Sequence, residues 1–197
     1  MATNEFDYYL IERDNNFMSP LLMNDDENNP GGTMFLRNME RVASETIVHL
    51  VFNPPYPPKP DMTDYLFLQC RSVFTRRIYD VLKDMAIKDF QLVPALIKDP
   101  QGNEYSDYWI VGVYKEFAFL DEENSEFDGV TSDGCWNGIE KMAIDKEKMA
   151  KIPLEDRLIY VGKESSAYVY YHKSIVDAIM SVNPTGIRFI SVEEWED

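Results

Sequence analysis

The stretch from Phe90 to Phe119, FQLVPALIKDPQGNEYSDYWIVGVYKEFAF, decides the fold class. It begins with a strand-like run at Phe90–Ile97 and continues through Asp99–Asn103, which supplies the Pro and Gly of a turn. A second run, Tyr108–Phe119, is apolar almost without interruption, as is typical of a strand buried on both faces. Strands that follow one another in this way indicate a sheet that does not alternate regularly with helices.

Two helices are expected among further strands. The first spans Arg71–Ala86, with Ser72 placed as its N-cap. Its apolar residues recur at helical spacing and are Phe74, Ile78, Val81, Leu82 and Met85. The last helix has Ile175, Ala178, Ile179 and Val182 on one face, and it ends at Asn183–Gly186. The other predicted strands are Phe6–Glu12, Thr46–Phe52, Gly138–Ile144, Arg157–Gly162, Ala167–Tyr171 and Ile187–Ser191.

The clustering of strands favours the α+β class, with a mainly antiparallel or mixed sheet and a few packed helices. A chain of 197 residues can bury about 70 % of its unfolded surface in one domain. We therefore expect a single domain over residues 1–197. Residues 53–60 are a Pro-rich connector that excludes helix and sheet interior. Residues 13–45 fit no clear period, and their role stays open.

The negative charge is concentrated in three segments. The chain has a formal net charge of -16. Residues 1–30 hold seven acids and one base, residues 121–133 hold six acids and no base, and residues 193–197 hold four acids. Nucleic acid and membrane surfaces are unsuitable ligands, because both attract clustered Lys and Arg. A basic protein partner is the natural complement, although acidic segments that only maintain solubility would look the same.

The sequence also favours a reducing, cytoplasmic location. Cys70 and Cys135 lie far apart and form neither a disulfide framework nor a thiolate metal motif. Residues 1–12 carry acids and no basic region of the kind that begins a secretory signal. The longest apolar runs, such as Thr46–Phe52, are far shorter than the roughly 20 residues of a membrane span.

Motifs for catalysis or cofactor binding are not found in the sequence, which contains no phosphate-binding loop, dinucleotide fingerprint or nucleophile elbow. His49 lies in a strand-like apolar run and is expected to be half-buried, while His172 begins the last helix and is expected to cap it. Cys70, close to the predicted first helix, is interpreted as a structural residue in preference to a nucleophile. We expect no cofactor and no enzyme activity.

One segment imitates a calcium loop. Asn124, Glu126 and Asp128, followed by Gly129, match positions 1, 3, 5 and 6 of such a loop. Position 12 falls on Cys135, where the loop requires a bidentate Glu. The EF-hand interpretation is therefore rejected, and a looser divalent-ion site in this segment stays open.

The same segment and its flanks carry a family resemblance. The residues that carry it are Leu92–Ala95, Tyr108–Val111, Phe119–Ser125, the helix at Ser174–Val182 and the turn and strand at Thr185–Phe189. In this order they resemble the bacterial immunity family eleven, formerly a domain of unknown function, of polymorphic toxin systems. The resemblance covers about residues 61–191, and His172 stands where such proteins tend to have Ser. It implies an antitoxin-like binder without catalytic residues.

We therefore expect an immunity protein that binds and neutralises a cognate toxin through an acidic surface complementary to a basic toxin domain. The candidate partner-binding residues are Asp121, Glu122, Glu123, Glu126, Phe127, Asp128 and Asp133. Trp136 is a further aromatic anchor or a core residue, and Asp121 and Ser125 equally fit a local turn. A small enzyme of unrecognised type and an acidic mimic of nucleic acid remain alternatives, as does the N-terminal acidic segment as the interface.

Overall fold

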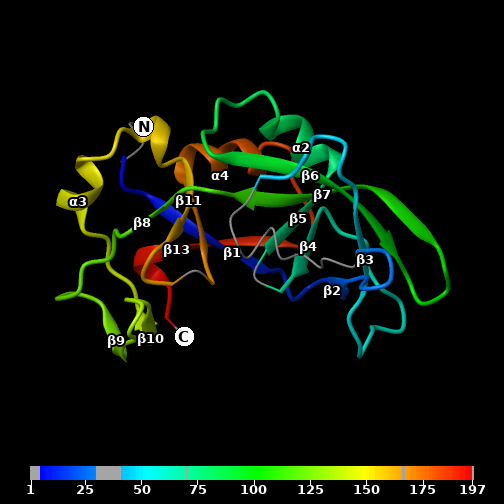
Figure 1. Ribbon diagram of the computed structural model, residues 1–197, viewed down its shortest axis with the longest axis horizontal. Coiled ribbons are helices and arrows are strands. Elements are labelled where there is room, and N and C mark those ends of the chain that lie inside the picture. Colours follow the sequence, from blue (N-terminus) through cyan, green and yellow to red (C-terminus); the bar gives the residue numbers. More distant parts are fainter. Residues whose placement is uncertain (1–4, 30–40, 70, 166, 197) are drawn as a thin grey trace.

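The strands of the chain form a closed barrel, a central sheet and a separate hairpin. The computed structural model describes residues 5–29, 41–69, 71–165 and 167–196. Six strands close the barrel, five form the central sheet and two form the hairpin. The barrel lies at one end of the molecule and the hairpin at the other, with the central sheet between them (Figure 1).

The elements have the following bounds. In pairing order the barrel contains β2 (Leu21–Asn24), β3 (Val48–Phe52), β6 (Phe90–Lys98), β7 (Glu104–Val113), β5 (Arg71–Thr75) and β4 (Tyr65–Leu68). The central sheet contains β13 (Ile187–Ser191), β1 (Tyr8–Arg13), β12 (Val169–His172), β11 (Ile159–Gly162) and β8 (Glu116–Phe117). The hairpin is β9 (Glu126–Val130) and β10 (Trp136–Lys141). The helices of the described residues are α2 (Arg76–Leu82), α3 (Lys146–Ala150), α4 (Lys173–Met180) and the 3₁₀ turns η1 (Leu154–Asp156) and η2 (Val192–Glu194).

The class is α+β, as predicted, and the pairing is mixed. Most neighbouring strands are antiparallel, while β2–β4, β3–β6 and β8–β11 are parallel. The parallel pair β2–β4 closes the barrel, and the sequence did not predict this closure. No helix in the described part of the chain is long and apolar enough to cross a membrane.

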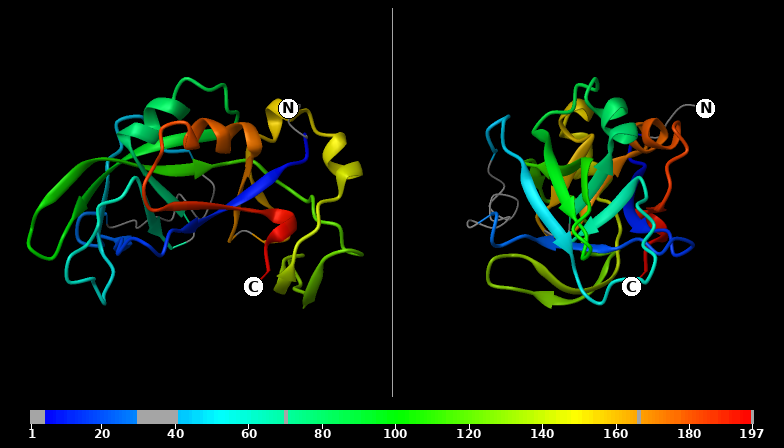
Figure 2. Two further views of the ribbon diagram at one scale, coloured as in Figure 1. Left: turned by 180° about the vertical axis from the view of Figure 1, so that it is seen from behind. Right: turned by 90° about the vertical axis from the view of Figure 1, so that its right-hand side faces the viewer.

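Successive side chains of a strand point to opposite faces, and the buried apolar side chains form three hydrophobic clusters. The barrel is filled by inward-facing side chains such as Leu50, Val73 and Ile110. The other face of β4, β5 and β7 joins one face of the central sheet, α2 and α4 in a second cluster that includes Phe74 and Tyr171. The opposite face of the central sheet packs beneath the hairpin in a third cluster. The central sheet is thus buried on both faces, and α2 and α4 lie side by side along it (Figure 2).

The first predicted helix, Arg71–Ala86, is wrong at both ends. Residues 71–75 form strand β5, and the helix begins only at Arg76 and ends at Leu82, four residues before Ala86. Ser72 therefore caps nothing, and its hydroxyl is instead 3.2 Å from the hydroxyl of Tyr171. The helical spacing was misleading because Phe74 and Ile78 both face the second cluster, one from the strand and one from the helix.

Other boundaries differ by a few residues. The run predicted at Tyr108–Phe119 is β7, which begins at Glu104, followed by the short strand β8. The strand predicted at Gly138–Ile144 is β10, which begins and ends earlier, while Ile187–Ser191 agrees with β13. The undecided range 13–45 contains β2, and part of it lies outside the described residues. The connector at 53–60 contains neither helix nor strand, as predicted.

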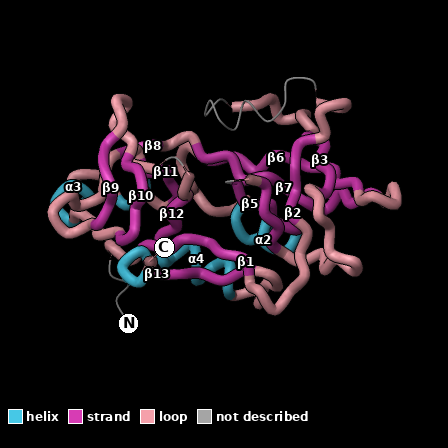
Figure 3. The backbone as a smooth tube through the Cα atoms, turned by 90° about the horizontal axis from the view of Figure 1, so that it is seen from below, coloured by secondary structure: helices cyan, strands magenta, loops and turns pink. Residues whose placement is uncertain are grey.

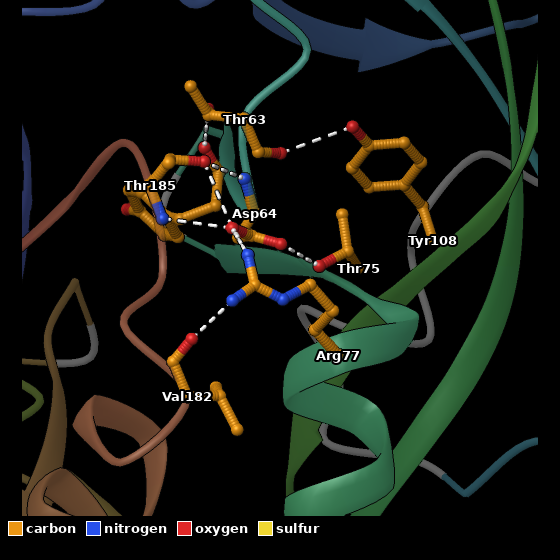
Figure 4. Close-up of polar contacts among 8 residues, drawn as sticks. Thr63, Asp64, Thr75, Arg77, Tyr108, Val182 and Thr185 are labelled. Carbon is orange, nitrogen blue, oxygen red and sulfur yellow. Dashed lines mark hydrogen bonds and ion pairs between the residues drawn. The ribbon is translucent and has the colours of Figure 1, made fainter.

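A buried carboxylate, Asp64, ties the barrel to the rest of the fold (Figure 4). It lies immediately before β4 and accepts hydrogen bonds from the Thr75 hydroxyl at 2.6 Å and from Arg77 Nη1 at 2.9 Å. It also accepts from the backbone N–H and the hydroxyl of Thr185, in the loop between α4 and β13. Arg77 extends the link by donating to the carbonyl of Val182. One side chain therefore joins β4, β5, α2 and this loop.

Candidate partner-binding surface

The acidic segment that the sequence singles out forms the β9–β10 hairpin and the turn before it. Residues Thr131–Cys135 close the hairpin, with the N–H of Thr131 donating to the carbonyl of Cys135 at 2.8 Å. Gly134 in this turn has a φ of +86°, which favours glycine. Gly138 has a φ of +52° and directly faces Asp128, whose Oδ2 would lie 2.2 Å from a Cβ at that position. The hairpin shape thus depends on two glycines.

The two faces of the hairpin have different chemistry. Phe127 and Trp136 stack with their ring centroids 4.0 Å apart and pack against the third cluster, which Ile139 also joins. Both rings are half-buried, so they support the hairpin from below. Glu126 and Asp128 alternate with Phe127 along β9 and are exposed on the outer face. The hairpin therefore shows acids to solvent and aromatic rings to the core.

Asp121 organises the turn that leads into the hairpin. Its carboxylate accepts from the N–H groups of Glu123 at 3.0 Å and Asn124 at 3.3 Å, and from the Asn124 amide at 2.7 Å. These bonds, with that of the Asn124 side chain foremost, hold the pKa of Asp121 below its usual value. Ser125 is buried, and its hydroxyl accepts from the N–H of Ala143 at 3.0 Å. The local-turn interpretation is confirmed for Asp121. It is not confirmed for Ser125, whose side chain bonds Ala143, 18 positions along the chain.

Glu164, which sequence reasoning missed, anchors the hairpin from below. It is only 5 % exposed, and its Oε1 accepts from the N–H groups of Phe119 at 2.7 Å and Leu120 at 2.8 Å. Its backbone carbonyl accepts from the N–H of Trp136 at 2.7 Å. A lone Glu in a Lys-Glu-Ser-Ser sequence gives no signal of burial. The position follows only from how the chain packs.

Most acids of the segment have no cationic neighbour. Glu122, Glu123, Asp128 and Asp133 are exposed, and none forms an ion pair within the described ranges. Glu126 has only a long contact, 3.8 Å, with Lys141. The hydroxyl of Thr131 donates to Asp133 and is the main reason that the pKa of this carboxyl is lowered. Of these five acids, Glu126 alone has an ion-pair partner within the described ranges.

The C-terminal acidic segment lies beside the hairpin. Glu196 and Lys141 form an isolated antiparallel bridge, which brings the chain end alongside β10 (Figure 2). Two of the three acidic segments therefore meet in space. We call Glu122, Glu123, Glu126, Asp128, Asp133 and Glu196 the acidic surface. The acids at 25–27 follow β2 in the barrel, at the opposite end of the molecule (Figure 3).

The calcium-loop match is not arranged as a metal site. Asn124 lies in the preceding turn, where its side-chain amide donates to Asp121, whereas Glu126, Asp128 and Gly129 lie in β9. The described residues contain no group of three or more His, Cys, Asp or Glu side chains that could hold a metal.

The two histidines have structural positions. His172 is the N-cap of α4, as predicted, and accepts from the N–H of Ser174 at 3.2 Å. His49 is half-buried in β3, also as predicted. Cys70, weighed as a nucleophile, lies outside the described residues, and Cys135 is a free thiol.

Comparison with known protein families identifies the family of this chain. No curated protein matches the chain. The sequence model of the immunity protein family Imm11 matches residues 7–194. The resemblance seen in the sequence over about residues 61–191 therefore extends across the first sixty residues as well, through β1, β2 and β3. The match covers nearly the whole chain, and this protein belongs to the Imm11 family of immunity proteins.

Proposed function

We propose that this immunity protein neutralises a cognate toxin by binding a basic domain of that toxin with the acidic surface. The family supports an immunity role, and the meeting of the hairpin with the C-terminal segment supports this surface as the site. The decisive observation is that Glu122, Glu123, Asp128 and Asp133 are exposed without an ion-pair partner in the described chain. A basic partner would gain most from such acids, because no lysine or arginine among the described residues pairs with them.

The geometry suggests how such a complex would be stabilised. Exposed acids at a rim mainly accelerate encounter, and apolar contact at the centre slows dissociation. Val130 is 55 % exposed at the end of β9, between Asp128 and the turn that holds Asp133. The stacked pair of Phe127 and Trp136 lies beneath this face and keeps it rigid. A toxin surface with basic side chains around an apolar patch would fit this arrangement.

The proposal requires no turnover. An immunity protein of this kind acts in the cytoplasm by occupying the toxin, with no metal or cofactor. The purified protein is expected to show no hydrolase, transferase or nuclease activity. A turnover that disappears in His172→Ala or in Cys70→Ala, but not in Ala86→Ser, would contradict this part of the proposal.

The test uses the toxin domain encoded beside the gene. Association rates are measured by surface plasmon resonance at several salt concentrations for the wild type and for E122Q/E123Q/E126Q/D128N. The control variant E27Q/E45Q/D84N/E104Q removes four exposed acids elsewhere and changes the net charge equally. We expect the first variant to associate at least about tenfold more slowly at low salt, with a weaker salt dependence. The control is expected to associate within about twofold of the wild type.

Two results would contradict the proposal. If both variants slow association equally, only net charge matters and the acidic surface is not the site. If neither variant changes the rate or its salt dependence, acids do not steer this encounter. Circular dichroism of both variants establishes beforehand that the fold is intact, which is expected because all eight side chains are exposed.

A further inference from the structure

The structure contains a cavity that the proposed function does not use. It has a volume of about 540 Å³ and lies between β1 and β12 of the central sheet and β4 and β5 of the barrel. This size falls within the range of about 300–1,000 Å³ that is typical of small-molecule sites. Its apolar walls include Phe67, Tyr65 and Tyr171. None of the residues of the acidic surface lines this cavity.

Four of the residues that line this cavity carry a hydroxyl group, namely Ser72, Tyr65, Tyr168 and Tyr171. The hydroxyls of Ser72 and Tyr171 are 3.2 Å apart, and both residues are buried. Burial raises the pKa of Tyr171 to about 12, and it also raises the pKa of Tyr65. Both phenols are therefore neutral at physiological pH and able to donate a hydrogen bond. Such donors suit an oxygen-bearing ligand.

The cavity is locally basic in a strongly acidic protein. Arg13 and Arg71 line it, and Glu12 is the only acid among its lining residues. The carboxylate of Glu12 accepts from Arg188, so its charge is partly compensated. Arg13 donates to the backbone carbonyl of Ser19 at 2.6 Å, a bond that leaves its positive charge in place. Arg71 is 7 % exposed, and its charge acts to lower the pKa of Tyr171.

We propose that this cavity binds a small amphipathic anion, namely an aromatic carboxylate whose ring lies against Phe67 and Tyr65. The carboxylate would pair with the guanidinium groups of Arg71 and Arg13 and accept from the buried hydroxyls. Arginine is suited to this role because its planar group can hold a carboxylate with two parallel bonds. The inference concerns a different site from the toxin surface and does not depend on it.

The test compares three probes that share a ring and differ in charge. Indole-3-acetate, indole-3-ethanol and tryptamine are titrated into the full chain at about 0.15 M salt, which screens the long-range repulsion of an anion. Binding is followed by isothermal titration calorimetry and by amide shifts in NMR spectra. Indole-3-acetate is expected to bind at least about tenfold more tightly than tryptamine, as one charge-assisted hydrogen bond permits. The shifts are expected in β1, β4, β5 and β12.

Two variants locate the site. Ala167→Trp fills the cavity from an exposed lining position and is expected to abolish binding of all three probes. Its matched control, Ala86→Trp, places the same side chain at an exposed position that does not line the cavity and is expected to bind normally. Arg71→Gln is expected to remove the preference for the carboxylate while leaving indole-3-ethanol unaffected.

Three outcomes would overturn the proposal. The first is that no probe binds at about 1 mM, where even weak specific ligands are detected. The second is equal binding of the anion and the cation, and the third is binding that persists in Ala167→Trp. If Arg71→Gln does not fold, the charge series on the wild type and the pair of Trp variants still decide the matter.

Discussion

Asp64 and Thr185 bond to each other in both directions although they lie 121 positions apart in the chain. The Asp64 carboxylate accepts from the N–H of Thr185 at 2.9 Å and from its hydroxyl at 3.0 Å. The N–H of Asp64 in turn donates to the same hydroxyl at 3.1 Å. These bonds fix the loop that enters β13 against the start of β4, and so join the C-terminal strand to the barrel.

The ionised form of Asp64 is stabilised by its neighbours. Burial is the largest influence on this group and opposes ionisation, but hydrogen bonds from Thr75 and Thr185 and the charge of Arg77 outweigh it. The net effect holds the pKa of Asp64 below its ordinary value. A neutral replacement would leave several of these donors poorly satisfied.

Asp64→Asn is therefore expected to lower the free energy of unfolding by about 3 kcal/mol. For a chain of this length such a loss corresponds to a melting temperature about 6–12 °C lower. Urea unfolding followed by circular dichroism and by tryptophan fluorescence measures the effect.

Asp107→Asn is the matched control. Asp107 pairs with Arg76 at 3.2 Å, but both side chains are more than half exposed, at 72 % and 55 %. The same chemical change is expected to cost less than about 1 kcal/mol there. Equal losses of unfolding free energy in the two variants would show that the buried hydrogen bonds of Asp64 stabilise the fold no more than an exposed ion pair does.

Acid should remove the contribution of Asp64. Since its pKa is lowered in the folded state, its stabilisation is fully present above the unfolded value of about 3.9. It is lost as the pH falls through the lower, folded value. The difference in unfolding free energy between wild type and Asp64→Asn is thus expected to be constant between about pH 7 and pH 5 and to shrink near pH 3. A difference that grows on acidification would contradict the assigned direction.

The sequence predicted well the strands that adjoin clear turn residues, such as Asp99–Asn103 after β6 and Asn183–Gly186 before β13. Strand β13 has the predicted bounds, and β6 extends the predicted Phe90–Ile97 by one residue. The error at residues 71–75 arose because both faces of this strand are apolar. Val73 faces the barrel interior and Phe74 faces the second cluster, so a strand buried on both faces shows no alternation. Barrel closure through β2 and β4 depends on contacts between distant segments, which no local pattern records.

Part of the candidate site was also visible in the sequence. The concentration of acids at residues 121–133 is a local property, and a local turn at Asp121 follows from its side-chain chemistry. The contact between Glu196 and Lys141 joins segments with no shared motif. The burial of Glu164 and the cavity near Arg71 likewise arise from packing alone.

Gly138 is expected to be sensitive to substitution. Its φ of +52° costs a residue with a Cβ about 1–2 kcal/mol, and the new methyl group would collide with Asp128. Gly138→Ala is therefore expected to loosen the hairpin, seen as faster hydrogen exchange at the amides of β9 and β10.

Gly129→Ala is the control within the same hairpin, because a Cβ there meets nothing within 4 Å. It is expected to change stability by no more than about 0.5 kcal/mol. Adding Asp128→Ala to Gly138→Ala is expected to restore part of the protection, because it removes the collision and leaves only the backbone strain. If both single glycine variants behave alike, the close approach of Asp128 is not what restricts position 138.

Salt is expected to stabilise the folded protein. The acids of the hairpin meet those of the C-terminal segment, and each segment has one described ion pair, Lys141–Glu126 and Lys146–Glu193. Their mutual repulsion is screened within about 8 Å at physiological ionic strength. Salt also weakens exposed ion pairs such as Arg76–Asp107, but each of these contributes at most about 1 kcal/mol. With a net charge of -16, relief of repulsion is expected to outweigh this loss, and about 0.2 M NaCl should raise the melting temperature by a few degrees.

The variant E122Q/E123Q/E126Q/D128N is expected to show a smaller rise in melting temperature with salt than E27Q/E45Q/D84N/E104Q, because it removes charge where the two segments meet. An unchanged or lower midpoint in the wild type would show that its exposed ion pairs outweigh the repulsion among the uncompensated acids.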